Sequence, residues 1–463
     1  MTSFSADEVR DDFVPKADFL DRRFHELEKE NLWPKVWQAA CRLEEIPEPG
    51  DYATYDIIDD SIVVVRRGPD EVAAYHNACP HRGTQLVDPA DHGGKGSIRE
   101  FLCSFHGWRF GLDGRNVEVV DRDDWGGCLK AGDADLAPVQ AGIWGGWVWI
   151  NMDPDCQPLM EFLSPMAEMC ELFEFDKLRP AWNKSVVVQA NWKTVLGAFT
   201  EFYHVQTTHA QMLTYTDDYS TSRGMGRHGW ISYAASSGLP VARSPRLPPK
   251  EVPDFREYLY EYAEQFTGDL QAMMTDRAYQ ATQRLRTEVP ADAAPGEVLG
   301  KWAGFIYEAA IESGAGWPGQ LTPEYIAASG FDWHVFPNTA FLHPAIEAVL
   351  WYRFRPHGDD HERCLIDVWS FERFAPGTEP EVEHQTFADW RDGDFPLIFR
   401  QDFLNIPKVQ RGMKSRGFKG GRPSPVQERA VSNFHRSLRR FLEDPHADDH
   451  LQPEPPVQGF GPS

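Results

Sequence analysis

The pattern of apolar and polar positions changes twice along the chain. Residues 1–40 mix charged residues with apolar ones at helical intervals, which predicts a helical N-terminal segment. From 41 to 155 the apolar residues instead form short runs, at 52–57, 61–65 and 146–150, with glycine, proline and aspartate between them. Short runs divided in this way are typical of a small all-β domain.

Beyond residue 155 the pattern is mixed. Helical stretches at 160–175 and from 191 onward flank a strand-like run at 185–189. Further strand-like runs and one more helical stretch follow at 339–342, 348–354, 364–371 and 395–416. We therefore predict a larger domain of helices and strands over 156–442. The polar, proline-rich tail over 443–463 should be flexible or pack against another subunit.

Length and composition fit a folded protein of two domains. The 463 residues exceed the size at which one core usually stops growing, and 41% of them are hydrophobic. A net charge of -25 disfavours nucleic acid and anionic membranes as partners. The longest apolar run, 142–150, is too short to span a bilayer, and the N-terminus does not resemble a signal peptide. We expect a cytoplasmic protein that binds neither membrane nor nucleic acid.

The cysteines do not suggest a disulfide framework. An odd number, seven, in so long a chain suits a reducing compartment, where metal binding or burial accounts for them. They are Cys41, Cys79, Cys103, Cys128, Cys156, Cys170 and Cys364.

Two short Cys/His pairs lie in the predicted β domain. Cys79 and His81 form a Cys-x-His pair, Cys103 and His106 form a Cys-x-x-His pair, and 21 residues separate the two pairs. Two thiolates and two imidazoles suit either a tetrahedral zinc ion or a Rieske [2Fe–2S] cluster. Nearby glycines favour the cluster, because they let the backbone approach closely and supply amides to cluster sulfurs. They are Gly83, Gly107, Gly111 and Gly114.

The segment 191–209 carries a second set of metal-binding side chains. Its apolar positions predict a helix, with Asn191 as a plausible N-cap. Glu201 and His204 are three residues apart and share a face of this helix. His204 and His209 are five apart, so a shared metal requires the helix to end or bulge between them. Two histidines with one carboxylate form the facial triad of non-haem iron oxygenases.

Together these motifs resemble those of the large (alpha) subunit of the aromatic-ring-hydroxylating dioxygenases, which are Rieske non-haem iron oxygenases. The resemblance rests on Cys-Pro-His-Arg-Gly from Cys79, Cys-Ser-Phe-His-Gly-Trp from Cys103, and the segment 191–209, within a similar region of roughly 35–415. It implies a Rieske cluster on both Cys/His pairs.

The resemblance also implies a fold. This is an α+β protein with a small all-β Rieske domain over 41–155 and a catalytic domain over 156–442. The catalytic domain is expected to have a helix-grip (START-like) fold with an antiparallel sheet, and the segment 1–40 to pack on it.

For the second site, the resemblance implies a mononuclear iron. His204 and His209 match the family's iron ligands, and the third ligand falls on Asp402 in Phe399-Arg-Gln-Asp402. Asn191 matches a residue that recurs near the family's active site.

The resemblance also implies an oligomer. Glu201 stands where many members have aspartate, at the residue that connects this site to the cluster of a neighbouring chain. It should link His204 to His106 of that chain, within a homotrimer that, in some members of the family, also includes a β subunit.

The implied function is that of an oxygenase component. We expect it to use O2 and reducing equivalents from NAD(P)H to hydroxylate an aromatic or apolar substrate by ring dihydroxylation. The alternative is a monooxygenase, an O- or N-demethylase or a quaternary-amine hydroxylase, because glutamate at position 201 also occurs among relatives that act on quaternary amines. An apolar substrate cavity is expected from about 195 to 350, with Phe202, Met212, Leu213, Phe305, Trp317, Trp333 and Phe336.

A separate reductase should deliver the electrons, with or without a ferredoxin, because no Gly-x-Gly-x-x-Gly nucleotide motif follows a strand. An acidic donor could dock on basic residues near the Cys/His pairs, namely Arg82, Lys95, Arg99, Arg109 or Arg115.

Two other classes of function remain open. A Rieske electron carrier with an appended domain would have no second iron, and a binding module would have neither metal site. The iron content separates the three, with three irons per chain for the enzyme, two for the carrier and none for the binding module.

Overall fold

The computed structural model describes residues 4–233 and 241–455, so the end of the predicted tail, 456–463, lies outside the described residues. The chain divides into two compact units. One comprises Leu27–Phe162 and is called the β unit below; the other comprises Met1–Glu26 and Leu163–Ser463 and is called the mixed unit.

The β unit is built on an antiparallel sheet whose described strands follow the order β2-β11-β10-β5-β4-β3-β6. A smaller sheet, β7-β8-β9, carries one of the Cys/His pairs at its tip. The short runs predicted at 52–57, 61–65 and 146–150 are confirmed as strands. The strands are β2 (Gln38–Arg42), β3 (Asp51–Ile57), β4 (Asp60–Gly68), β5 (Glu71–His76), β6 (Lys95–Ser97), β7 (Phe101–Leu102), β8 (Arg109–Phe110), β9 (Asn116–Glu118), β10 (Pro138–Trp144) and β11 (Trp147–Asn151).

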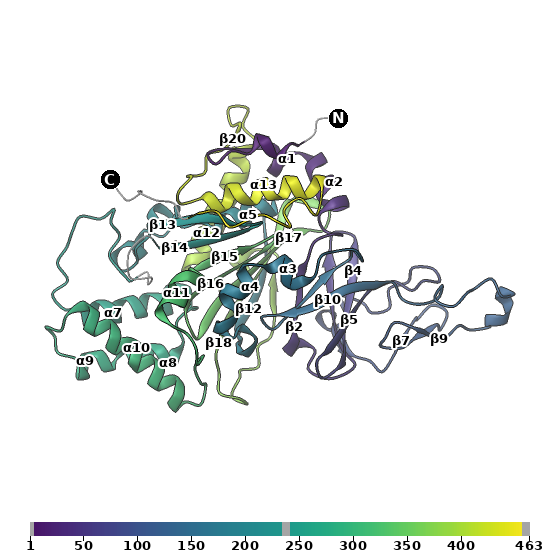
Figure 1. The fold of residues 1–463 in the computed structure, drawn as a ribbon, viewed down its shortest axis with the longest axis horizontal. Coiled ribbons are helices and arrows are strands. Elements are labelled where there is room, and N and C mark those ends of the chain that lie inside the picture. The colour runs from purple at the N-terminus through teal and green to yellow at the C-terminus, as the bar shows by residue number, and fades with distance from the viewer. Residues whose placement is uncertain (1–3, 234–240, 456–463) are drawn as a thin grey trace. The chain divides into compact units, whose positions relative to one another are not determined.

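The mixed unit is built on a larger sheet, with the order β13-β14-β15-β16-β17-β18-β12-β19 among the described residues (Figure 1). Its pairs are antiparallel except for β12 with β19, which are parallel. The predicted antiparallel sheet is therefore confirmed, with one parallel edge strand added. The strands are β12 (Arg179–Val188), β13 (Ser220–Met225), β14 (His228–Tyr233), β15 (Asp332–Val335), β16 (Thr339–Ala345), β17 (Ala348–His357), β18 (Asp360–Glu372) and β19 (Gln385–Phe387).

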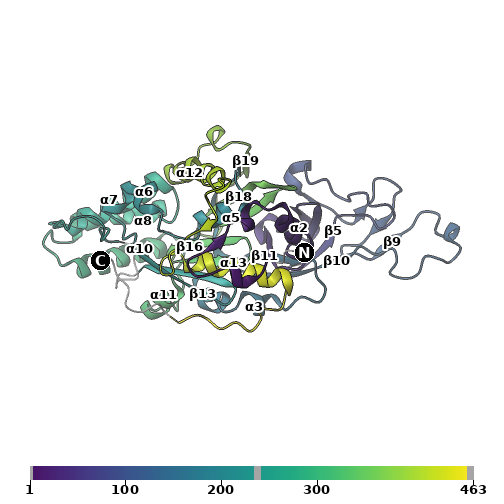
Figure 2. The ribbon, with the colours of Figure 1, turned by 90° about the horizontal axis from the view of Figure 1, so that it is seen from above.

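Some helices of the mixed unit pack on this sheet, and others form a separate cluster. α13 (Arg429–Glu443) packs on β13 and β14, whereas α5 (Trp192–Ala198) packs on β17 and β18 and contacts α12 (Leu397–Met413). α7 (Phe255–Gln265), α8 (Asp276–Thr282), α9 (Arg284–Glu288) and α10 (Pro295–Glu312) form a separate group (Figures 1 and 2).

The remaining elements are short. The other α-helices are α1 (Ala17–Leu20), α2 (Arg22–Asn31), α3 (Leu159–Leu163), α4 (Met166–Cys170), α6 (Val205–Thr208) and α11 (Pro323–Ser329), and the strands β1 (Val14–Pro15) and β20 (Gly420–Gly421) pair with each other. Within the described ranges, no helix is long and apolar enough to cross a membrane.

Candidate metal centres

Two loops of the β unit carry the Cys/His pairs. One follows β5, and the other joins β7 to β8. A glycine closes each loop: the Gly83 N–H donates to the Cys79 carbonyl at 2.8 Å, and the Gly107 N–H donates to the Cys103 carbonyl at 3.0 Å. Both glycines have positive φ angles, 79° and 73°, which glycine adopts without strain. A Cβ at Gly83 would meet nothing within 4 Å, so backbone conformation rather than close approach explains this glycine.

The four side chains of these pairs converge. The rings of His81 and His106 lie 4.5 Å apart, and Trp108 stacks flat on His81 at 4.8 Å. The thiols of Cys79 and Cys103 lie close enough for each to shift the pKa of the other. Nδ1 of each histidine is buried without a hydrogen-bond partner among the described residues. A buried polar atom without a partner is costly, so two such nitrogens beside two thiols fit the ligand set of a [2Fe–2S] Rieske cluster.

Backbone amides surround the sulfurs as well. Burial raises the pKa of the Cys79 thiol. Burial acts on Cys103 too, but the N–H groups of Phe105 and His106 donate to its sulfur and contribute to a pKa below the ordinary value. These donors come from the loop residues themselves rather than from the predicted glycines. Amides placed in this way stabilise negative charge on sulfur, as a cluster requires.

In the mixed unit, the helix predicted over 191–209 is interrupted. α5 (Trp192–Ala198) ends before the first histidine, and a one-turn helix, α6 (Val205–Thr208), follows separately. His204 precedes α6 as its N-cap residue and His209 follows it as its C-cap residue. Of the two expected possibilities, the helix therefore ends rather than bulges. This break lets two histidines five residues apart face the same point.

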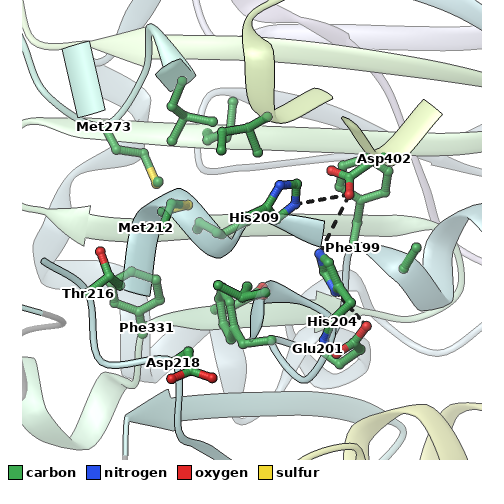
Figure 3. A pocket seen from close by; sticks show the side chains of 18 of the residues that line it. Phe199, Glu201, His204, His209, Met212, Thr216, Asp218, Met273, Phe331 and Asp402 are labelled. Atoms are coloured by element: carbon green, nitrogen blue, oxygen red, sulfur yellow. Dashed lines mark hydrogen bonds and ion pairs between the residues drawn. The ribbon is translucent and has the colours of Figure 1, made fainter. Parts of the chain in front are cut away.

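His204, His209 and Asp402 form a compact group (Figure 3). Asp402 lies on α12 and is 4% exposed. Its Oδ1 is 3.0 Å from Nε2 of His209 and 3.6 Å from Nε2 of His204. The three ligand atoms all lie within 4.8 Å of one another. The fold thus brings together side chains that lie nearly two hundred positions apart in the sequence.

The other ring nitrogen of each histidine, Nδ1, makes a hydrogen bond to a neighbouring side chain. Nδ1 of His204 lies 2.6 Å from Oε1 of Glu201, and Nδ1 of His209 lies 2.8 Å from Oε1 of Gln401. Both oxygens are acceptors, so each histidine keeps its proton on Nδ1 and directs Nε2 toward the metal-binding group. Gln401 is itself paired with Gln211, at 2.9 and 3.2 Å.

The charges of this group favour a bound cation. Burial alone would lower the pKa of His204, but the carboxylates of Glu201, Asp402 and Glu428 outweigh it and raise the pKa to about 9. Two imidazole nitrogens and one carboxylate form the donor set of non-haem ferrous iron, with further positions left open. The residues present therefore fit an iron ion.

Two cavities meet at this group. The first, called the inner cavity, comprises about 710 Å³ of space between the sheet and α12, the solvent at its mouth included, and has a largely apolar lining. The second, called the outer cavity, encloses about 1050 Å³ and is lined by parts of α5, α12 and the segment 421–435. Glu201, His204 and Asp402 line both cavities. The candidate iron site can therefore be approached from two sides.

The lining of the inner cavity was predicted only in part. Phe202 and Met212 line it, but the prediction is wrong for Leu213, Phe305, Trp317, Trp333 and Phe336. Phe336, for example, packs against Phe434 of α13 at 6.0 Å. Apolar periodicity indicates that a residue is buried, but it does not indicate which space the residue faces.

Several site residues were not predicted from the sequence. Gln401 and Glu428 have no metal-ligand spacing, and the single signal for Gln401 is its place beside Asp402. Three acids also line the inner cavity, Asp217, Asp218 and Asp332. Asp332 could have been found as an acid within the otherwise mostly apolar run 331–336.

Asn191 caps α5. Its side chain accepts a hydrogen bond from the Lys193 N–H at 3.0 Å and donates one to the His361 carbonyl at 2.7 Å. It lines neither cavity. The contacts account for Asn191 as a helix cap, and the active-site role suggested by the family resemblance stays a prediction.

Most of the basic residues near the Cys/His pairs already have partners. Lys95 pairs with Glu45, Arg109 with Glu100 and Glu118, and Arg115 with Asp113, at 2.5 to 3.8 Å. Arg82 lies over the ring of Phe105 at 5.2 Å. The acidic side chains of a docking electron donor would therefore have to compete with these contacts for the basic residues.

The sequence matches two protein families. Residues 175–444 match the family described as "Ring hydroxylating alpha subunit (catalytic domain)", and residues 36–124 match the "Rieske [2Fe-2S] domain". The two matches fall on the mixed unit and the β unit respectively. The metals that these domains carry, a Rieske cluster and a mononuclear iron, are those that the two ligand sets fit.

Among characterised relatives, the chain is 30% identical over 209 residues to the glycine betaine monooxygenase oxygenase subunit of Chromohalobacter salexigens, covering 45% of this chain and 46% of the relative. It is 33% identical over 206 residues to the carnitine monooxygenase oxygenase subunit of Escherichia coli K12, covering 42% and 52%. The similarity thus spans about half the length of these relatives. The 2-aminobenzenesulfonate 2,3-dioxygenase alpha subunit of an Alcaligenes species is 29% identical over 219 residues, covering 44% and 54%.

Solved structures share the fold over nearly the whole chain. A quaternary ammonium Rieske monooxygenase in complex with L-carnitine superposes with a TM-score of 0.63 at 18% identity, covering 95% of this chain and 99% of the other. Naphthalene 1,2-dioxygenase from a Rhodococcus species, bound to indole, superposes with a TM-score of 0.59 at 20% identity, covering 93% and 94%.

Proposed function

The chain belongs to the ring-hydroxylating alpha-subunit family, and on this basis we propose that it is the oxygenase component of a Rieske non-haem iron oxygenase. The cluster would be held by Cys79, His81, Cys103 and His106, and the iron by His204, His209 and Asp402. The observation that carries the proposal is the convergence of three ligand atoms within 4.8 Å at the wall of a mostly apolar cavity.

When bound, the cluster supplies electrons one at a time and the iron activates O2. The protein orients the metal ligands and excludes water from the site. Glu201 and Gln401 hold the Nδ1 protons of His204 and His209, which fixes both rings. The apolar lining of the inner cavity keeps water from the bound substrate and from reactive oxygen species.

We propose monooxygenation rather than the ring dihydroxylation expected from the motifs alone. Two relatives are named as monooxygenases of glycine betaine and of carnitine, which favours the amine-oxidising alternative. Glutamate at position 201 is consistent with that group. The buried acids of the inner cavity also suit a nitrogen-containing substrate better than a hydrocarbon.

We further propose that electrons reach the iron from a neighbouring chain. An apolar patch beside the cluster loops comprises Leu102, Phe105, Val117 and Val120, and Phe105 is 55% exposed. The outer cavity could receive such a patch, because Glu201 and His204 line it and the His204 side chain is 25% exposed. A cyclic trimer would then place His106 of one chain near Glu201 of the next.

The test is turnover with labelled oxygen. The iron-loaded protein, with a surrogate reductase and NADH, would be offered glycine betaine, carnitine, methoxyarenes and naphthalene under ¹⁸O2. One labelled atom in the aldehyde that is released when a C–N bond of the amine is cleaved, reduced to its alcohol as it forms so that the label cannot exchange with water, supports the proposal. Two labelled atoms in a cis-diol support ring dihydroxylation instead. Iron contents of two or of none per chain, without product, would indicate the electron carrier or the binding module.

A further inference from the structure

Asp332 is a buried carboxyl with an oxygen that no described residue hydrogen-bonds. It begins β15, is 1% exposed and lines the inner cavity. Its Oδ1 is buried and has no hydrogen-bond partner among the described residues. Burial raises the pKa of Asp332 well above its ordinary value. An ionised carboxylate in this position is costly unless a donor or a positive charge comes to it.

Other buried acids of the mixed unit differ from Asp332 in this respect. Four of them are each paired with an arginine at 2.6 to 2.8 Å: Asp18 with Arg439, Asp218 with Arg246, Glu347 with Arg277 and Asp367 with Arg353. Asp217, which also lines the inner cavity, accepts a hydrogen bond from the Tyr219 N–H at 2.9 Å. Asp332 differs from these acids, and a bound ligand with a donor or a positive charge would supply the partner that it lacks among the described residues.

Aromatic rings lie beside Asp332 in the same cavity. The rings of Tyr233 and Phe331 are 4.6 Å apart, and Phe202 lies 5.5 Å from the first and 5.8 Å from the second. All three residues line the inner cavity, and in Figure 3 Phe331 lies on the opposite side of the pocket from Asp402. Faces of aromatic rings attract organic cations, and a carboxylate beside them adds a full negative charge.

The acid also lies within electrostatic range of the candidate iron site. Burial raises the pKa of Tyr352, and the carboxylates of Asp332 and Asp402 raise it further. Tyr352 lines the inner cavity with both of them. A molecule that fills this cavity would therefore contact Asp332 and also the metal-binding group.

We propose that Asp332 is the counter-ion for a positively charged organic substrate, whose ammonium group sits against Asp332, Tyr233 and Phe331. The inference rests on the proposed function, because it takes the inner cavity as the substrate site. It goes further in assigning the charge that the substrate must carry and the residue that recognises it. Two kinds of ammonium fit: a quaternary one, held by charge and ring faces, and a protonated amine, which would also donate a hydrogen bond to Asp332.

The test compares three probes of similar shape by calorimetry on the iron- and cluster-loaded protein. They are choline, a quaternary ammonium; N,N-dimethylethanolamine, a protonated tertiary amine at neutral pH; and 3,3-dimethyl-1-butanol, an uncharged analogue. We expect at least one ammonium to bind about tenfold or more tightly than the alcohol. Which ammonium binds better distinguishes the two kinds of substrate.

Asp332→Asn should abolish this preference while the iron content and the cluster absorption spectrum stay unchanged. Asp217→Asn is the matched control, since it removes an acid from the same cavity and should leave the preference in place. Equal binding of ammonium and alcohol, no detectable binding of either ammonium, or a preference that survives Asp332→Asn overturns the assignment. If the wild-type protein prefers an ammonium probe but oxidises no amine, the assignment of Asp332 stands and the proposed function is overturned instead.

Discussion

The two histidines of the candidate iron site are oriented by different acceptors. His204 donates to the carboxylate of Glu201, whereas His209 donates to the amide of Gln401. A carboxylate makes the imidazole a stronger base than an amide does. Glu201 also lines the outer cavity, while Gln401 is paired with Gln211. Replacing each acceptor should therefore have a different effect.

Glu201→Gln should separate metal binding from electron delivery. The glutamine amide oxygen can still accept a hydrogen bond from the His204 Nδ1–H, so both metals should stay bound. The charge that would link to a neighbouring His106 is lost. We expect steady-state turnover to fall about 100-fold, because electrons no longer reach the iron from the neighbouring cluster. Iron analysis and the rate of cluster oxidation in a single turnover measure the two effects. Normal single-turnover product formation would contradict this role, and Glu201→Asp serves as the conservative control.

Gln401→Leu should act on the metal itself. The His209 Nδ1–H would lose its acceptor, so the ring would be free to turn and iron affinity should fall about 10- to 100-fold. Titration of the iron-free protein with ferrous iron measures the change. Gln401→Glu, which keeps an acceptor in place, should bind iron nearly as well as the wild type. Equal iron affinity of the leucine variant would show that packing alone holds His209.

At this scale the sequence predicts local groups better than distant ones. The Cys/His pairs lie within short loops, so spacing alone suggests that each pair is contiguous. Asp402 could be reached only by family resemblance, because nothing in local spacing joins α12 to α6. Asp332 and Gln401 were not predicted, since their roles depend on which side chain or cavity they face after folding.

Among the elements, the break between α5 and α6 has the largest consequence for the site. An uninterrupted helix would turn His204 and His209 away from each other. Instead, α5 ends at Ala198 and α6 starts afresh at Val205. The sequence indicated that an end or a bulge was needed, but helical periodicity could not choose between them. The start of α5 at Asn191 was predictable, because a capping side chain acts on the nearest backbone amides.

Asn191→Ala should destabilise the mixed unit. The Lys193 N–H and the His361 carbonyl would both lose a partner, so the free energy of unfolding should fall by about 1 to 2 kcal/mol. Urea denaturation followed by fluorescence measures this loss. Asn191→Asp keeps the acceptor for Lys193 and should recover part of it. If the alanine variant is as stable as the wild type but loses turnover per bound iron, the active-site role is supported instead.

For the whole molecule, the proposed trimer can be tested by complementation between chains. A His106→Ala chain would lack the cluster but keep the iron ligands, and an Asp402→Ala chain would keep the cluster but lose the iron. Each alone should be inactive. Mixed trimers, formed by co-expression, should regain a sizeable part of wild-type turnover, because cluster and iron meet across a chain boundary.

The control for this experiment is to mix the separately purified variants without subunit exchange, which should restore nothing. If co-expressed chains form mixed oligomers that stay inactive, as seen with two different affinity tags, electrons do not pass between chains and the role proposed for Glu201 is refuted.

The placement of the iron ligands also bears on how the mixed unit unfolds. His204 and His209 flank one short helix, whereas Asp402 lies on another that comes much later in the chain. An ion held by all three acts as a cross-link: it closes the chain between 204 and 402 into a loop, which the unfolded protein cannot form without paying the entropy of closure. The catalytic metal would thus also stabilise the packing of α6 against α12, two elements that line the inner cavity.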